Sequence, residues 1–152
     1  MNELQVADFR KICARYRPMA ENIRSLRERE TELRLQMNGV HAVRCSGYSH
    51  SRTSGDTRVL RYMAKIDELR TETAKYENRL HLIDRLFAGC SNEAARIIVW
   101  RACVQRIPVR RLAELYDISE RTAEKQIRSG ILSILHAAEP AVLAEAAEWC
   151  RS

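Results

Sequence analysis

The side chains best placed for chemistry in this 152-residue chain are hydrogen-bond donors between residues 110 and 128. Arg121, Thr122 and Lys125 fall within five residues, and side chains of these types can bind the edges of bases in a DNA groove. A second set has the charge or hydroxyl group that suits phosphate oxygens: Arg110, Arg111, Ser119 and Arg128. We therefore take the first set as candidate base contacts and the second as candidate backbone contacts.

Two short helices joined by a sharp turn are predicted to position these side chains. The first runs from about Val109 to Tyr116, with its apolar positions at Leu112, Ala113, Leu115 and Tyr116. The turn is Asp117-Ile118-Ser119, because aspartate tolerates a left-handed backbone and Ile118 can fill the core beneath it. Ser119 is a good N-cap for the second helix, which spans about residues 119–136.

The second helix has an apolar side and a cationic side. At about 100° per residue, five apolar or small residues share one side: Ala123, Ile127, Gly130, Ile131 and Ile134. Arg121, Lys125 and Arg128 fall on the opposite side. This pattern is typical of the recognition helix of a helix-turn-helix, which enters the major groove. The alternative is an ordinary amphipathic helix pair whose arginines are only solvated.

The same segment resembles the fourth-region helix-turn-helix of bacterial sigma factors. The matching positions are Ala113, Ile118, Ser119, Glu120, Arg121 and Thr122. Asp117 stands where the family has a turn glycine, and Ala123 where it has valine. Over roughly residues 20–136 the organisation also resembles small phage-encoded sigma-like regulators of the ArpU type. The resemblance implies that residues 92–136 engage promoter DNA and that RNA polymerase is a second partner.

Two long stretches ahead of this segment carry apolar residues at alternating three and four spacing. In about Glu3–Met37 the row is Phe9, Ile12, Tyr16, Met19, Ile23, Leu26, Leu33 and Met37, interrupted by Glu30. In about Thr57–Phe87 it is Val59, Tyr62, Ile66, Leu69, Thr73, Tyr76, Leu80, Ile83 and Phe87. Matched rows on consecutive helices predict an antiparallel coiled-coil hairpin, which could also form a homodimer. Residues 38–57 are expected to form a flexible tip loop. Pro18 either kinks the first helix or marks its start, and in the second case residues 4–16 form a short separate helix.

The predicted fold is all-α, with the hairpin followed by a compact tri-helical helix-turn-helix domain. Residues 1–90 would form the hairpin and residues 91–137 the DNA-binding domain. Its third helix runs from Glu93 to Arg106, capped by Ser91 or Asn92, with inward residues Ala95, Ile98, Val99, Ala102 and Cys103. Residues 138–152 would form a short C-terminal helix that packs on the domain or on a second chain.

Composition narrows the function classes. The formal net charge of +6 favours a polyanionic partner. Five scattered cysteines without a Cys-x-x-Cys pair indicate reduced thiols and a cytoplasmic location, and no apolar run is long enough to span a membrane. His41, Cys45 and His50 are too few for a zinc site, so no metal or cofactor is expected. With no catalytic motif in the chain, an enzyme is not expected either.

The leading hypothesis is therefore a sequence-specific regulator of transcription that binds double-stranded DNA. One alternative is a phage packaging protein of small-terminase type, which would form rings that light scattering detects. Another is a coiled-coil adaptor that binds only protein, and it would fail to retard any duplex at low salt.

Overall fold

The computed structural model describes residues 4–45 and 52–152, and within them the side chains of residues 4–40 and 57–152. Every regular element in these ranges is helical, which confirms the predicted all-α class. The contacts divide the chain into two units. One unit, here called the head, contains residues 4–19 and Arg79–Ser152, and the other, here called the arm, is Ala20–Asn78. This differs from the sequence-based division at residue 90, because the start of the first long helix and the end of the second pack with the C-terminal helices.

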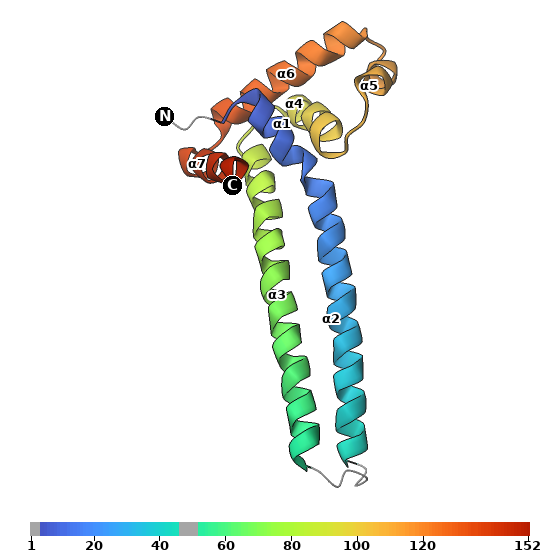
Figure 1. The fold of residues 1–152 in the computed structure, drawn as a ribbon. Helices are drawn as coiled ribbons and strands as arrows, with labels where there is room; N and C mark the ends of the chain where they lie inside the picture. The colour runs from blue at the N-terminus through green and yellow to red at the C-terminus, as the bar shows by residue number, and fades with distance from the viewer. Residues whose placement is uncertain (1–3, 46–51) are drawn as a thin grey trace. The chain divides into compact units, whose positions relative to one another are not determined.

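The arm is built from helix α2 (Tyr16–Cys45) and helix α3 (Arg52–Ala88), which lie side by side and run in opposite directions (Figure 1). The expected apolar rows face inward, with Ile23, Ile66 and Leu69 buried. The other row positions of the arm are half-buried: Leu26, Leu33, Met37, Val59, Tyr62, Thr73 and Tyr76.

The predicted tip loop at residues 38–57 is wrong at both ends, because α2 continues to Cys45 and α3 begins at Arg52. Gly39 weakens a helix by about 1 kcal/mol relative to alanine. Val40, however, continues the spacing of the inward row and is half-buried, so the helix carries on past the glycine. The rest of the predicted loop lies outside the described residues.

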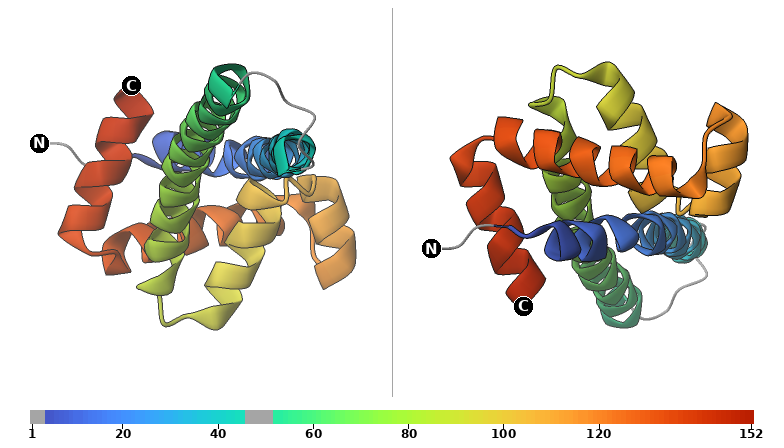
Figure 2. Two further views of the ribbon diagram at one scale, coloured as in Figure 1. Left: turned by 90° about the horizontal axis from the view of Figure 1, so that it is seen from below. Right: turned by 90° about the horizontal axis from the view of Figure 1, so that it is seen from above.

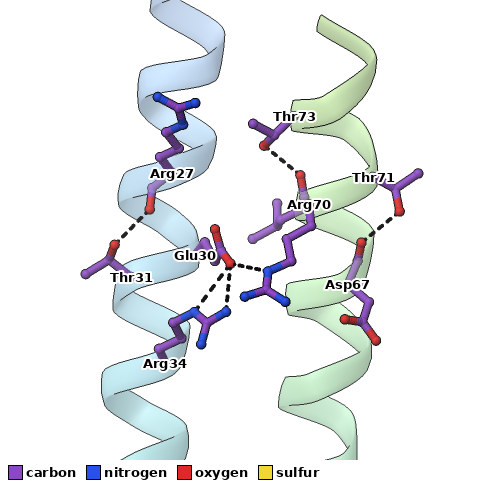
Figure 3. A network of polar contacts seen from close by, with 9 residues as sticks. Arg27, Glu30, Thr31, Arg34, Asp67, Arg70, Thr71 and Thr73 are labelled. Carbon is purple, nitrogen blue, oxygen red and sulfur yellow. Dashed lines mark hydrogen bonds and ion pairs between the residues drawn. The ribbon is translucent and has the colours of Figure 1, made fainter. Parts of the chain in front are cut away.

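Glu30, the polar interruption of the α2 row, joins the two helices of the arm. Its Oε1 accepts hydrogen bonds from Arg70 Nε of α3 at 2.7 Å and from Arg34 Nη2 of α2 at 3.1 Å (Figure 3). Arg27 of α2 also pairs with Glu77 of α3. These cross-helix pairs specify which residues of α2 and α3 lie at the same level.

The head is organised around helix α6 (Glu120–Ala137), against which helices α1 (Val6–Ala14), α4 (Glu93–Val99) and α5 (Val109–Tyr116) all pack (Figure 2). Helix α1 ends before Arg15, and α2 starts at Tyr16, so residues 4–16 do contain a separate short helix. Pro18 is the third residue of α2, where its missing N–H has no intrahelical partner to lose.

The predicted helix from Glu93 to Arg106 departs from regular α geometry halfway along. After α4 the chain makes a π-helical turn, η1 (Trp100–Val104), in which Gln105 N donates to Trp100 O. A π turn contains one residue more than an α turn, so it moves the inward row along by one position. Cys103 and Val104 are therefore buried, whereas Ala102 is only half-buried.

The π turn also places the Trp100 ring in an aromatic cluster. This ring meets Tyr16 and Phe87 in edge-to-face contacts, each with ring centroids 5.1 Å apart. Phe87 in turn meets Phe9 of α1. The cluster ties η1 to the head ends of α1, α2 and α3.

Helix α7 (Pro140–Arg151) packs on α1, which belongs to the head but lies outside the predicted domain of residues 91–137. Trp149 is 7% exposed, and the guanidinium groups of Arg15 and Arg79 lie 5.4 and 5.5 Å from the centre of its ring.

Within the described ranges no single helix is long and apolar enough to cross a membrane. Helices α6 and α7, bent by 118° at the break between them, meet that test by length and composition only as a pair.

Two titratable groups with raised pKa values are thiols buried in the head, Cys13 and Cys103. Burial raises the pKa of the Cys13 thiol, and the nearby Cys103 adds to the rise. Burial also raises the pKa of Cys103, although Arg10 and Arg106 oppose that shift. Both thiols are therefore neutral and unreactive packing groups at physiological pH.

Candidate nucleic-acid interface

Helix α6 carries the two faces expected from its sequence. Ala123, Ile127, Ile131 and Ile134 are fully buried, and Gly130 is buried with them. Arg121, Lys125 and Arg128 are exposed on the other side, and Thr122, at the start of the helix, is also exposed. Among the residues that the structure describes, no ion pair uses one of these three cations. The helix therefore has an apolar inner face and a solvent-facing row of cations.

Gly130 is the point of closest approach between α6 and α4. A Cβ atom placed on Gly130 would lie 2.7 Å from Val99 Cγ2 and 3.3 Å from Ala95 O. Because a real Cβ needs more room, only glycine allows this spacing. The close contact fixes α4 as the support of α6.

The turn between α5 and α6 is made by Asp117, whose backbone is left-handed at φ 53° and ψ 50°. Ile118 N donates to Ala113 O at 3.0 Å and Asp117 N donates to Glu114 O at 3.3 Å, which satisfies carbonyl groups at the end of α5. Ile118 is half-buried beneath the turn. The expectation that aspartate takes the left-handed position is confirmed.

Ser119 caps the start of α6. Its Oγ accepts a hydrogen bond from Thr122 N at 3.1 Å and donates one to Thr122 Oγ1 at 2.8 Å. The Ser119 and Thr122 hydroxyl groups therefore share one hydrogen bond inside the turn, and the hydroxyl that accepts it keeps its own hydrogen.

The first turn of α5 presents Arg110 and Arg111 to solvent. Arg110 Nε lies 4.0 Å from Glu114 Oε1, and both side chains are largely exposed. Surface pairs of this kind contribute about 0–1 kcal/mol, so Arg110 can exchange this partner for a phosphate at little cost.

One apolar position predicted for α5 is wrong. Leu112 and Ala113 are buried and Tyr116 is half-buried, but Leu115 is 59% exposed. Leu115 lies roughly 110° round the helix from the midpoint of Leu112 and Ala113, which turns it away from α6.

Arg101 is a contributor to this region that sequence reasoning missed. Its Nη1 donates to Tyr116 Oη at 2.8 Å, and its guanidinium carbon lies 5.7 Å from the centre of the Tyr116 ring. The contact links η1 to the end of α5, just before the turn. Arg101 and Tyr116 are fifteen residues apart, which follows no helical period, so no local sequence pattern indicates the contact.

Among the described residues, no group of three or more His, Cys, Asp or Glu side chains could hold a metal ion. The side chains of His41, Cys45 and His50 lie outside the described set. No protein-family model matches the chain, and searches of curated proteins and of solved structures give no match either.

Proposed function

We propose that the protein is a sequence-specific transcription regulator that binds double-stranded DNA and is sigma-factor-like. In this proposal α5, the Asp117 turn and α6 form a helix-turn-helix, and α4 is the third helix of a tri-helical domain. Helix α6 is the recognition helix, with Arg121, Thr122 and Lys125 at base edges. The phosphate backbone is contacted by Arg110, Arg111, Ser119 and Arg128.

The observation that carries the proposal is the division of α6 into a fully buried face and an exposed cationic face. A helix that enters the major groove needs a rigid inner anchor and free donors on its outer side. The buried row from Ala123 to Ile134 supplies the anchor, and Arg121 and Lys125 supply donors near the amino end. The left-handed Asp117 and the Ser119 cap hold α5 and α6 at a fixed angle.

The arm is proposed to be a coiled coil that brings in a second binding partner. A single DNA-binding module buries only about 600–1,000 Å² of protein surface, which limits specific affinity. Dimerisation through α2 and α3, or contact with RNA polymerase, would add the missing affinity. The mass of the purified protein with and without polymerase distinguishes these two roles.

The first experiment selects bound sequences from a random pool of duplexes and then measures affinity for the selected site and for random DNA. Arg121→Ala is expected to weaken binding to the selected site by about 1–3 kcal/mol and to relax the preference at one base pair. An equal loss on selected and random duplexes would contradict a base-reading role for Arg121. Absence of any selected sequence would contradict the proposed function.

Arg110→Ala serves as the matched comparison, because it also removes one exposed arginine. It is expected to weaken binding to all duplexes. The plot of log affinity against log salt should become shallower by the amount that corresponds to about one lost phosphate contact. A change in the preferred sequence, with the salt slope unaltered, would remove Arg110 from the backbone set.

A further inference from the structure

Helix α6 has two flanks between its buried face and its row of exposed cations, here called the cationic crest (Arg121, Lys125 and Arg128). The two flanks differ in charge. One flank lies roughly 60–120° round the helix from the inward-facing Ala123. The other flank lies roughly 60–100° from Ala123 in the opposite direction. The first flank, here called the neutral row, is uncharged: Thr122, Gln126, Ser129 and Ser133. The second flank carries Glu120 and Glu124, both exposed.

The neutral row borders an open groove. This groove, of about 580 Å³, runs between α4 and α6, and the whole neutral row lines it together with Lys125. The α4 side is formed by uncharged residues, namely Asn92, Ala94, Ala95 and Ile98. Gln126 and Ser129 are exposed within it.

The wall of the groove formed by α4 contains no carboxylate. Glu93, the nearest acidic residue of α4, lines a separate hollow together with Arg96, Ile97 and Trp100. An anionic strand that approaches the neutral row therefore meets small and neutral side chains on both sides.

Charge decides which flank can approach DNA. A duplex carries about one negative charge per 1.7 Å of its axis, and phosphates line both walls of the major groove. Glu120 and Glu124 would face one of these walls if the cationic crest pointed straight at the bases, and like charges repel. Turning the whole head about the axis of α6, so that its α4 side comes closer to the duplex, lifts the acidic flank away from the phosphates and brings the neutral row closer to the bases.

Resting on the proposed function, we infer that the head binds DNA turned about the α6 axis with its α4 side toward the duplex, and that Gln126 is a specificity-determining residue, with Ser129 beside it. Base reading then starts at the tip with Arg121, Thr122 and Lys125 and continues along the neutral row. A glutamine amide can donate to and accept from adenine in the major groove at the same time. Arg128, on the acidic side of the crest, is left to contact phosphate.

In the test, three proteins each select sequences from a random duplex pool, and the selected sequences are compared. The proteins are the wild type, Gln126→Ala, and Glu124→Gln as the matched variant on the opposite flank. Gln126→Ala is expected to lose about ten-fold in discrimination at one base pair while keeping its affinity for random DNA. Glu124→Gln is expected to bind all duplexes more tightly with an unchanged preference. Both positions are exposed, so thermal melting should show all three proteins equally folded.

Two results would overturn the inference while leaving the proposed function intact. One is an unchanged preference for Gln126→Ala together with a changed preference for Glu124→Gln, which would mean that the head is turned the other way. The other is an equal loss by Gln126→Ala on selected and random duplexes, which would make Gln126 a backbone contact. If the wild type selects no sequence at all, the proposed function fails and this inference fails with it.

Discussion

The head and the arm are both helical, but they exclude water from their interiors to different degrees. In the head, Phe9, Ile83, Leu112 and Ile127 have no exposed surface. In the arm, most inward positions are half-buried, and one of them is the carboxylate of Glu30. The head therefore depends on the fit of individual side chains, whereas the arm depends on many weaker contacts along two long helices.

This difference suits the two proposed roles. A recognition helix has to hold its donors in one position, which requires a rigid support such as the contact between Gly130 and α4. A long hairpin that recruits a second partner needs only a defined register, and the pairs Glu30–Arg70 and Arg27–Glu77 can supply it.

The sharpest way to test the contrast is to truncate one inward side chain in each unit. Ile127→Ala, at a fully buried position of α6, is expected to lower the free energy of unfolding of the head by about 2–5 kcal/mol. Leu33→Ala, at a half-buried position of α2, should cost the arm only about 1 kcal/mol because less apolar surface is lost. Denaturant titration followed by hydrogen exchange in α6 and α2 measures the two effects separately. Equal losses would show that the arm interior is as tightly packed as the head.

The same glycine-to-alanine change is expected to have opposite signs in the two units. Gly130→Ala should destabilise the head, because overpacking against Val99 costs about 1–3 kcal/mol, more than the gain in helix propensity. Gly39→Ala in α2 meets no atom within 4 Å and should stabilise the arm by about 0.5–1 kcal/mol.

Thermal melting of the two single variants gives the signs. Adding Val99→Ala to Gly130→Ala removes the atom that clashes, so the double variant should lose less than the sum of the two single changes. A strictly additive loss would show that the contact with Val99 is not what destabilises Gly130→Ala.

The smallest effect is expected from the polar contacts of the arm. Glu30→Ala removes the acceptor shared by Arg34 and Arg70 and should cost about 0.5 kcal/mol, less at high salt, because the arginines are substantially exposed. Glu28→Ala is the control, since its pair with Arg24 lies within one helix. If both variants melt alike at low salt, the cross-helix pair adds no more stability than a pair within one helix.

Where a segment is specified by neighbouring residues, the sequence was sufficient to predict it. The bounds of α5, the left-handed Asp117, the Ser119 cap and the buried row of α6 all follow from turn chemistry and a 3.6-residue period, and all are confirmed. The inward rows of α2 and α3 follow from the heptad spacing in the same way.

The errors occur where distant contacts override local pattern. No local signal indicates that residues 4–19 pack with the C-terminal helices rather than with the arm. Gly39 and the polar residues around it are typical of a loop, but the inward row continues through Val40 and the helix continues with it. The neutral row has no charge or periodic signal in the sequence, and only its place beside the α4 groove singles out Gln126.

The extra residue in η1 has a consequence for chain length. A helix with a bulge can lose one residue there and become regular, while the segments before and after it keep their orientation. A relative of this chain that is one residue shorter between Asn92 and Pro108 could thus retain the same three-dimensional arrangement. Alignments of this region should accordingly permit a gap in mid-helix, where gaps are usually penalised most heavily.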